Sequence, residues 1–228
     1  MLDVIYEDNH IIVVIKPQNV PSQKDESGDK DMLTMVKEYI KEKYNKPGEV
    51  YCGLVHRLDR PTGGVMVFAK TSKAASRLCA QIQDGDFQKK YLAVVMGKPR
   101  LDCDHLVHYL KKDEKNNKVS VATQLEEGSK RCELSYKLIQ ALDEISLLEV
   151  KLYTGRSHQI RVQMATNKTP LFGDSKYGRV DNISKGFKLA LWAYDLEFVH
   201  PTTKQIMKFK VYPPLEELPW RMFDLKRV

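Results

Sequence analysis

Short β-branched runs that follow one another through turns, rather than alternating with helices, are the feature that most restricts how this chain can fold. The runs that predict strands cover residues 4–6, 11–15, 89–97, 131–139, 145–152, 189–198 and 205–211, with one more starting at Val65. Consecutive strands joined by turns pair antiparallel, whereas parallel strands need a long crossover. We therefore predict an α+β fold with a largely antiparallel mixed sheet flanked by helices.

Two segments place apolar residues at helical spacing, and a third places His158, Arg161 and Ala165 on one helical face; each begins with a residue that can cap a helix. These caps are Asp31, Ser72 and Ser157. Gly85 is a suitable end for the second helix, because glycine readily adopts the left-handed conformation that closes helices. The charged stretch 111–118 has no such pattern, and we expect a solvated loop there.

The composition sets broad limits on the class of protein. The chain has 228 residues, of which 42% are hydrophobic, and we expect a single globular domain over 1–228. Its four cysteines include no C-x-x-C pair, so we expect free thiols and no metal site. The net charge of +7 suits a polyanionic partner but does not identify one.

The sequence gives no reason to expect a membrane partner. No apolar run approaches the roughly 20 residues that a helix needs to cross a bilayer. The first residues, MLDVIYEDNH, carry acids early and lack the basic and apolar regions of a secretory signal. We therefore expect a cytoplasmic protein.

Residues 56–70, HRLDRPTGGVMVFAK, contain the strongest candidate for chemistry. Asp59 stands between Arg57 and Arg60, just before a turn that leads into the strand from Val65. Neighbouring guanidinium groups favour the ionised carboxylate. An acid that stays ionised is better suited to act as a nucleophile, or to stabilise a developing cation, than to act as a general acid. The competing interpretation of the residues alone is an Arg–Asp salt bridge in a loop.

Several ordered motifs resemble those of one family. HRLDRPTGG resembles the H-R-L-D-x-x-T-S-G signature of the RluA-type pseudouridine synthases. The opening hairpin with its Lys-Pro resembles that of the family as well. The other motifs that carry the resemblance, in chain order, are KKYLAVVMGKP, LYTGRSHQIRVQMA, LFGDSKYG and LALWAYDLEFVHPTT. Together they cover nearly the whole chain.

The resemblance implies a fold, an activity and a partner. The fold would be pseudouridine-synthase-like with a central catalytic cleft, formed by one catalytic domain without the extra N-terminal RNA-binding domain of many relatives. The activity would be conversion of a uridine in RNA to its C-glycoside isomer, with no cofactor or metal. The target base must leave its stack to react, so base flipping is expected. We expect the protein to act as a monomer.

The resemblance also assigns roles to particular residues. Asp59 matches the catalytic aspartate, and Arg161 matches the arginine that pairs with it. Tyr91 matches the tyrosine that packs on the target base and is a candidate for the late proton abstraction. Arg57 matches the arginine that enters the RNA stack as the base leaves.

Further residues are expected to contact RNA. We expect a base pocket lined by Leu54 or Ile160, and additional RNA contacts from the signature and from basic positions elsewhere: His56, Arg60, Lys89, Lys90, Arg156, Lys176 and Arg179. The chain departs from the family pattern at Gly63, where a serine is usual, and at Trp192, where a histidine is common. The contact made by that histidine is therefore in doubt.

Three functions compete on the sequence alone. The first is isomerisation of a uridine in large-subunit ribosomal RNA or in a transfer RNA stem-loop. The second is RNA binding without catalysis, and the third is a glycosidase that releases uracil. Within the first, the residues do not decide whether Asp59 attacks the sugar or removes a sugar proton.

Overall fold

The computed structural model describes residues 2–178 and 185–228, and the chain divides into two compact units. The first unit comprises Met1–Lys89 and Ala193–Val211. The second comprises Lys90–Trp192 and Tyr212–Val228. The prediction of a single domain over 1–228 stays a prediction.

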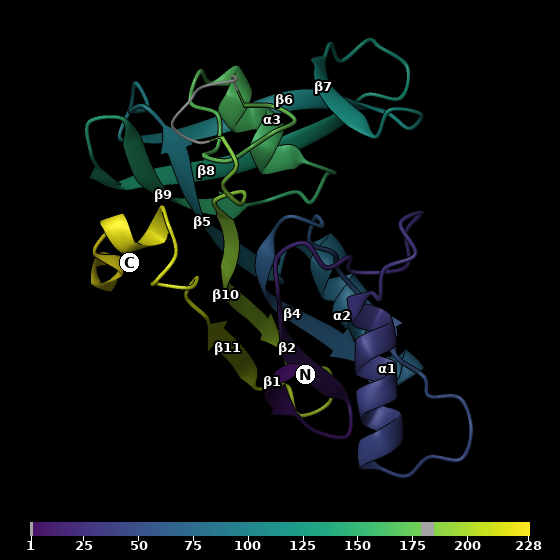
Figure 1. The fold of residues 1–228 in the computed structure, drawn as a ribbon. Coiled ribbons are helices and arrows are strands. Elements are labelled where there is room, and N and C mark those ends of the chain that lie inside the picture. Colours follow the sequence, from purple (N-terminus) through teal and green to yellow (C-terminus); the bar gives the residue numbers. More distant parts are fainter. Residues whose placement is uncertain (1, 179–184) are drawn as a thin grey trace. The chain divides into compact units, whose positions relative to one another are not determined.

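The first unit is built on antiparallel strands (Figure 1). Its strands are β1 (Asp3–Glu7), β2 (Ile11–Lys16), β3 (Gly53–Leu54), β4 (Gly63–Ala69), β10 (Leu191–Val199) and β11 (Ile206–Lys210). The sheet order is β1-β2-β4-β10, with β3 paired to β4 and β11 paired to β10. The pairings β1–β2, β2–β4, β3–β4 and β10–β11 are all antiparallel. This agrees with the antiparallel pairing that the short connections between strands predict.

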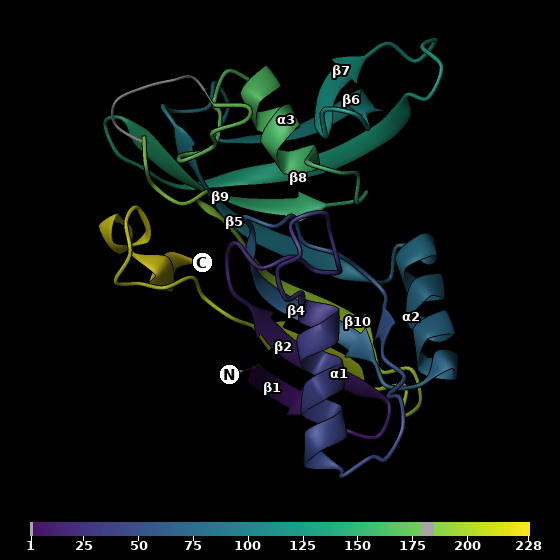
Figure 2. The same cartoon turned by 45° about the vertical axis from the view of Figure 1, so that its right-hand side comes forward.

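Two helices belong to the first unit (Figure 2). Helix α1 (Met32–Lys43) begins as predicted, with the Asp31 carboxylate accepting the Thr34 N–H at 3.1 Å. Helix α2 (Ser72–Asp84) ends as predicted at Gly85, whose φ is 84°. Its cap is Thr71 rather than the predicted Ser72, because the Thr71 hydroxyl is the group that accepts an amide of the first turn.

The core of the first unit lies between α2 and one face of the sheet. Alternate residues of β2 and β4 point to this face, as the period of a strand requires. Leu78 of α2 packs there, in a cluster completed by Phe87 and Phe198. Strand β4 is buried along its whole length, so it is covered on both faces. The signature loop therefore leads into a strand that cannot shift without disrupting the core.

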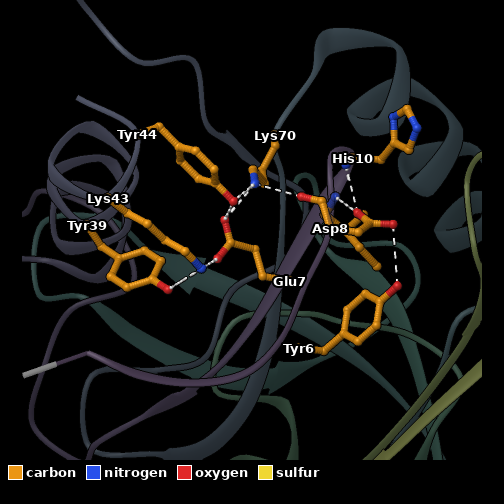
Figure 3. Close-up of polar contacts among 9 residues, drawn as sticks. Tyr6, Glu7, Asp8, His10, Tyr39, Lys43, Tyr44 and Lys70 are labelled. Atoms are coloured by element: carbon orange, nitrogen blue, oxygen red, sulfur yellow. Dashed lines mark hydrogen bonds and ion pairs between the residues drawn. The ribbon is translucent and has the colours of Figure 1, made fainter. Parts of the chain in front are cut away.

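A buried carboxylate ties three segments of the first unit together (Figure 3). The side chain of Glu7 on β1 is 6% exposed, and it accepts hydrogen bonds from Lys43 and Lys70, each at 2.6 Å. The hydroxyls of Tyr44 and Tyr39 add bonds of 2.9 Å and 3.2 Å. Burial alone raises the pKa of Glu7, but the hydrogen bonds from Lys43, Lys70 and Tyr44 bring it down to about 2.

The second unit has its own strands, β5 (Gln88–Met96), β6 (Cys103–Asp113), β7 (Lys118–Ala122), β8 (Lys130–Ala141) and β9 (Ile145–Leu152). They lie in the order β5-β9-β8-β6-β7, and β6–β7, β6–β8 and β8–β9 pair antiparallel. The predicted loop over 111–118 is wrong at both ends, because β6 continues to Asp113 and β7 begins at Lys118. Ladder hydrogen bonds across this hairpin stabilise strands that charged residues alone do not predict.

The second unit also contains α3 (Gln159–Thr166) and two short 3₁₀ turns, η1 (Trp220–Met222) and η2 (Leu225–Arg227). The residue before α3 is His158, in the left-handed conformation at φ 52° and without a side-chain cap, so the predicted cap at Ser157 is wrong. Among the residues that the structure describes, no helix combines the length and the apolar character needed to cross a bilayer.

Candidate active site

A buried lysine holds the loop that carries Asp59. Lys16 ends β2 and is fully buried, and its ammonium donates to the carbonyl oxygens of Pro17 at 3.1 Å, Arg60 at 3.0 Å and Thr62 at 2.6 Å. Burial lowers the pKa of Lys16 to about 7, although the charge of Asp59 acts to raise it. These contacts of Lys16 were not predicted from the sequence, where the residue stood only as part of a family motif. The position of Lys16 directly after a run of apolar strand residues was the sequence feature that could have indicated its burial.

Further bonds fix the same loop. The Ser22 hydroxyl donates to the Leu58 carbonyl at 2.7 Å and accepts the Leu58 N–H at 3.1 Å. The Thr62 N–H donates to the Asp59 carbonyl at 2.9 Å and closes the turn. Gly64 has a φ of 128°, and a Cβ there would overlap the backbone of Ala193, so only glycine fits. The backbone of Asp59 is therefore held on both sides.

The two arginines that flank Asp59 differ in their surroundings. Arg57 is exposed, whereas Asp59 is half-buried. Arg60 donates to Asp25 at 3.3 Å and to Asp29, and its hydrogen bond to the Asp29 carboxylate raises the pKa of Arg60. The carboxylates that engage Arg60 therefore come from the polar loop after β2. Arg57 is the more exposed arginine of this pair, and its contact with RNA stays a prediction.

The second unit carries the other predicted catalytic residues. Tyr91 on β5 is 6% exposed and Arg161 on α3 is 5% exposed. Arg161 makes a two-pronged ion pair with Asp174, with Nε to Oδ2 at 2.9 Å and Nη2 to Oδ1 at 2.6 Å. The guanidinium is thus aimed by a buried carboxylate. The predicted pairing of Arg161 with Asp59 stays a prediction.

Asp174 is a site residue that the sequence analysis missed. Its side chain is fully buried, and Oδ1 also accepts the N–H groups of Lys176 and Tyr177 at 2.9 and 3.1 Å. Burial alone raises the pKa of Asp174, but hydrogen bonds from Arg161 and its charge bring it below the ordinary value. The Gly-Asp pair in LFGDSKYG marked an ordered turn and gave no sign of its partner.

Tyr177 connects Arg161 to the start of α3. Its hydroxyl shares a 2.6 Å hydrogen bond with Nδ1 of His158 and accepts the Val119 N–H at 2.9 Å. The Arg161 guanidinium lies 5.1 Å from the centre of the Tyr177 ring. These contacts fix the left-handed turn at His158 and, through it, the direction of α3.

The remaining predicted contacts fall in varied surroundings. Ile160 is buried on α3, and Leu54 is half-buried on β3. Lys90 pairs with Glu149 at 3.4 Å. Two further basic residues are exposed, although each bonds a backbone carbonyl: Arg156 that of Arg131 and Lys176 that of Asn117. Arg179 lies outside the described residues. The two departures from the family pattern, Gly63 and Trp192, are both buried.

Comparison with known proteins decides the family. The model of the RNA pseudouridylate synthase family matches residues 10–166, a segment that includes Asp59, Tyr91 and Arg161. The chain belongs to this family. The family's relatives and solved structures then extend the comparison beyond that segment.

Curated relatives of the family match along most of this chain. Ribosomal large subunit pseudouridine synthase D of Borreliella burgdorferi is 34% identical over 85% of this chain, and that of Zymomonas mobilis is 32% identical over 93%. Synthase C of Vibrio cholerae is 31% identical over 93%. The chain spans 60%, 69% and 65% of the lengths of these three proteins.

Solved structures confirm the fold. Human RNA pseudouridylate synthase domain containing 4 superposes with a TM-score of 0.78 at 19% identity, covering 93% of this chain and 88% of its own. Human RNA pseudouridylate synthase domain containing 1 gives 0.74 at 24% identity, covering 94% and 84%. The predicted α+β fold of the pseudouridine synthase type is therefore confirmed, while its central cleft stays a prediction.

Proposed function

We propose that this protein is an enzyme that isomerises a specific uridine in structured RNA to pseudouridine. The observation that carries the proposal is the loop of Asp59, a half-buried carboxylate on a backbone immobilised by Lys16 and Ser22. A carboxylate fixed in this way can meet a reacting sugar without the cost of ordering the loop first.

The chemistry fits an ionised Asp59. Breaking the N-glycosidic bond of uridine builds positive charge on the sugar, and a carboxylate beside it lowers that cost or forms a covalent bond to the sugar. Removal of a sugar proton by the same carboxylate is the other route. In either case the freed uracil turns, and its fifth ring carbon bonds to the sugar in place of the nitrogen.

Other residues take supporting roles in the proposal. Arg161, aimed by Asp174, keeps the catalytic carboxylate ionised. Tyr91 packs on the uracil and is a candidate for the final proton abstraction. The exposed guanidinium of Arg57 enters the RNA stack in place of the flipped base.

The partner is a folded RNA with an accessible loop. Bases in an A-form stem present their edges poorly, so a stem-loop in ribosomal or transfer RNA is the expected target. The relatives are named for the large ribosomal subunit, which supports ribosomal RNA as the first candidate. We propose that the protein acts in the cytoplasm, as a monomer, and without a metal ion or cofactor.

Nucleoside analysis of treated RNA tests the proposal. Large-subunit ribosomal RNA and transfer RNA made without modifications are incubated with the protein, digested and separated. Pseudouridine at one position supports the proposal. Free uracil would instead show a glycosidase, and binding without any change in the nucleosides would show an RNA-binding protein without catalysis.

A further inference from the structure

A histidine of the signature loop holds a buried donor with no acceptor. His56 is 9% exposed, and its Nε2 accepts the Val67 N–H at 3.1 Å, so the proton of the neutral ring is on Nδ1. Among the described parts of the chain, Nδ1 has no hydrogen-bond partner. A buried donor without an acceptor costs roughly 1–3 kcal/mol, so its presence needs a reason.

The ring of His56 is restricted to one role. Burial, followed by the charge of Lys89, lowers the pKa of His56 to about 3, so the ring stays neutral at ordinary pH. Because Nε2 is engaged by Val67, the ring cannot exchange its proton between the two nitrogens without breaking that bond. His56 is thus a fixed hydrogen-bond donor through Nδ1, and neither an acid nor a base.

A cation lies near the same aromatic ring as His56. Lys89, at the start of β5, is half-buried, and burial lowers its pKa. Its ammonium is 5.9 Å from the centre of the Phe87 ring, and the His56 ring is 5.3 Å from the same ring. No carboxylate of residues 2–178 or 185–228 forms an ion pair with Lys89. A charge that is partly removed from water is stabilised by an opposite charge, so the half-buried Lys89 also lacks a favourable partner.

We propose that His56 and Lys89 together bind one phosphate of the RNA backbone, close to the uridine that reacts. Both groups donate and neither accepts, so they fit a ligand that only accepts hydrogen bonds. A neutral acceptor such as a uracil carbonyl would satisfy His56 but leave the charge of Lys89 without compensation. The phosphodiester is the group of RNA that satisfies both.

The position of the pair fits this role. His56 is three residues before Asp59 on the same immobilised loop, so a phosphate bound there would be fixed relative to the catalytic carboxylate. Nδ1 is buried in this structure, so the groups that cover it must shift as RNA enters. The proposal rests on the proposed function, because it takes RNA as the ligand.

Replacing single phosphates by neutral methylphosphonates tests the pair. A target stem-loop carries one neutral linkage at a time around the uridine, and the dissociation constant is measured for the native protein and for Lys89→Met. At one position, the neutral linkage should raise the dissociation constant of the native protein about tenfold. The same neutral linkage should change the dissociation constant of Lys89→Met little, because that variant has already lost the contact. Lys89→Met should also make the slope of the logarithm of the binding constant against the logarithm of the salt concentration shallower by about one.

Controls separate this proposal from the proposed function. Lys208→Met removes an exposed lysine that pairs with Glu197, and it should keep the full effect of the neutral linkage. Lys89→Met should unfold at the same temperature as the native protein or higher, because it loses a half-buried charge that has no ion-pair partner among the described residues. If Lys89→Met and the native protein lose affinity equally at every neutral linkage, the phosphate site is disproved, whether or not the RNA is isomerised. Pseudouridine analysis of the unmodified stem-loop tests the proposed function independently.

Discussion

Replacement of Glu7 by glutamine tests how much the hydrogen bonds of this buried carboxylate stabilise the first unit. At neutral pH the Glu7 carboxylate accepts four hydrogen bonds, two of them from lysines (Figure 3). Its pKa of about 2, against an ordinary 4.5, corresponds to about 3 kcal/mol, since each tenfold change in proton affinity is worth about 1.4 kcal/mol. Lys43 and Tyr44 are close to half exposed, and solvent screening reduces the figure to roughly 1–2 kcal/mol.

The pH dependence separates this network from ordinary packing. Folding lowers the pKa of Glu7, so its contribution is present above pH 4.5 and is lost as the pH falls toward 2. The free energy of unfolding, measured in urea, should therefore be higher for the native protein than for Glu7→Gln, and this difference should narrow as the pH falls from 4.5 to 2. Glu197→Gln, at a partly exposed pair with Lys208, is the matched control and should change stability little. A difference in free energy of unfolding between the native protein and Glu7→Gln that stays constant down to pH 2 would refute the reasoning.

Two further predictions concern the positions of the catalytic residues. Lys16→Met should lower turnover more than RNA affinity in single-turnover and binding assays, because the Arg60 and Thr62 carbonyls in the loop of Asp59 lose their donor. Folding lowers the pKa of Lys16 to about 7, so urea unfolding should show the free energy of unfolding of the native protein rising relative to that of Lys16→Met from pH 7 to 10; a constant difference would contradict the lowered pKa of Lys16. Asp174→Asn should reduce the rate of isomerisation at least tenfold with RNA affinity nearly unchanged, because Arg161 loses its ion pair; equal losses in rate and affinity would contradict a positioning role.

Local chemistry made much of the fold predictable. The β-branched runs became strands because their side chains suit a pleated, buried surface, and the caps at Asp31 and Gly85 satisfy backbone groups within one turn. Strands β6 and β7 were missed because ladder pairing with neighbours, rather than composition, stabilises a hairpin rich in lysine. At the start of α2, the side chains of Thr71 and Ser72 are both suited to cap the helix. The backbone conformation of the folded chain decides which of them is the N-cap.

The candidate site was predictable only in part. A motif identifies Asp59 because the residues that define its loop are contiguous. Lys16 and Asp174 act through partners 44 and 13 residues away, and nothing in a linear sequence identifies those partners. The missing acceptor of His56 is likewise a property of the folded chain, because Val67 engages the other ring nitrogen.

Turnover by Asp59→Asn tests the central claim most directly. The variant keeps the size of the side chain while removing the negative charge that the reaction needs. Pseudouridine formation is followed in the target RNA under single-turnover conditions, and RNA affinity is measured in parallel. The account predicts no detectable pseudouridine, with affinity within about a factor of ten of the native value. Measurable isomerisation by Asp59→Asn would contradict it.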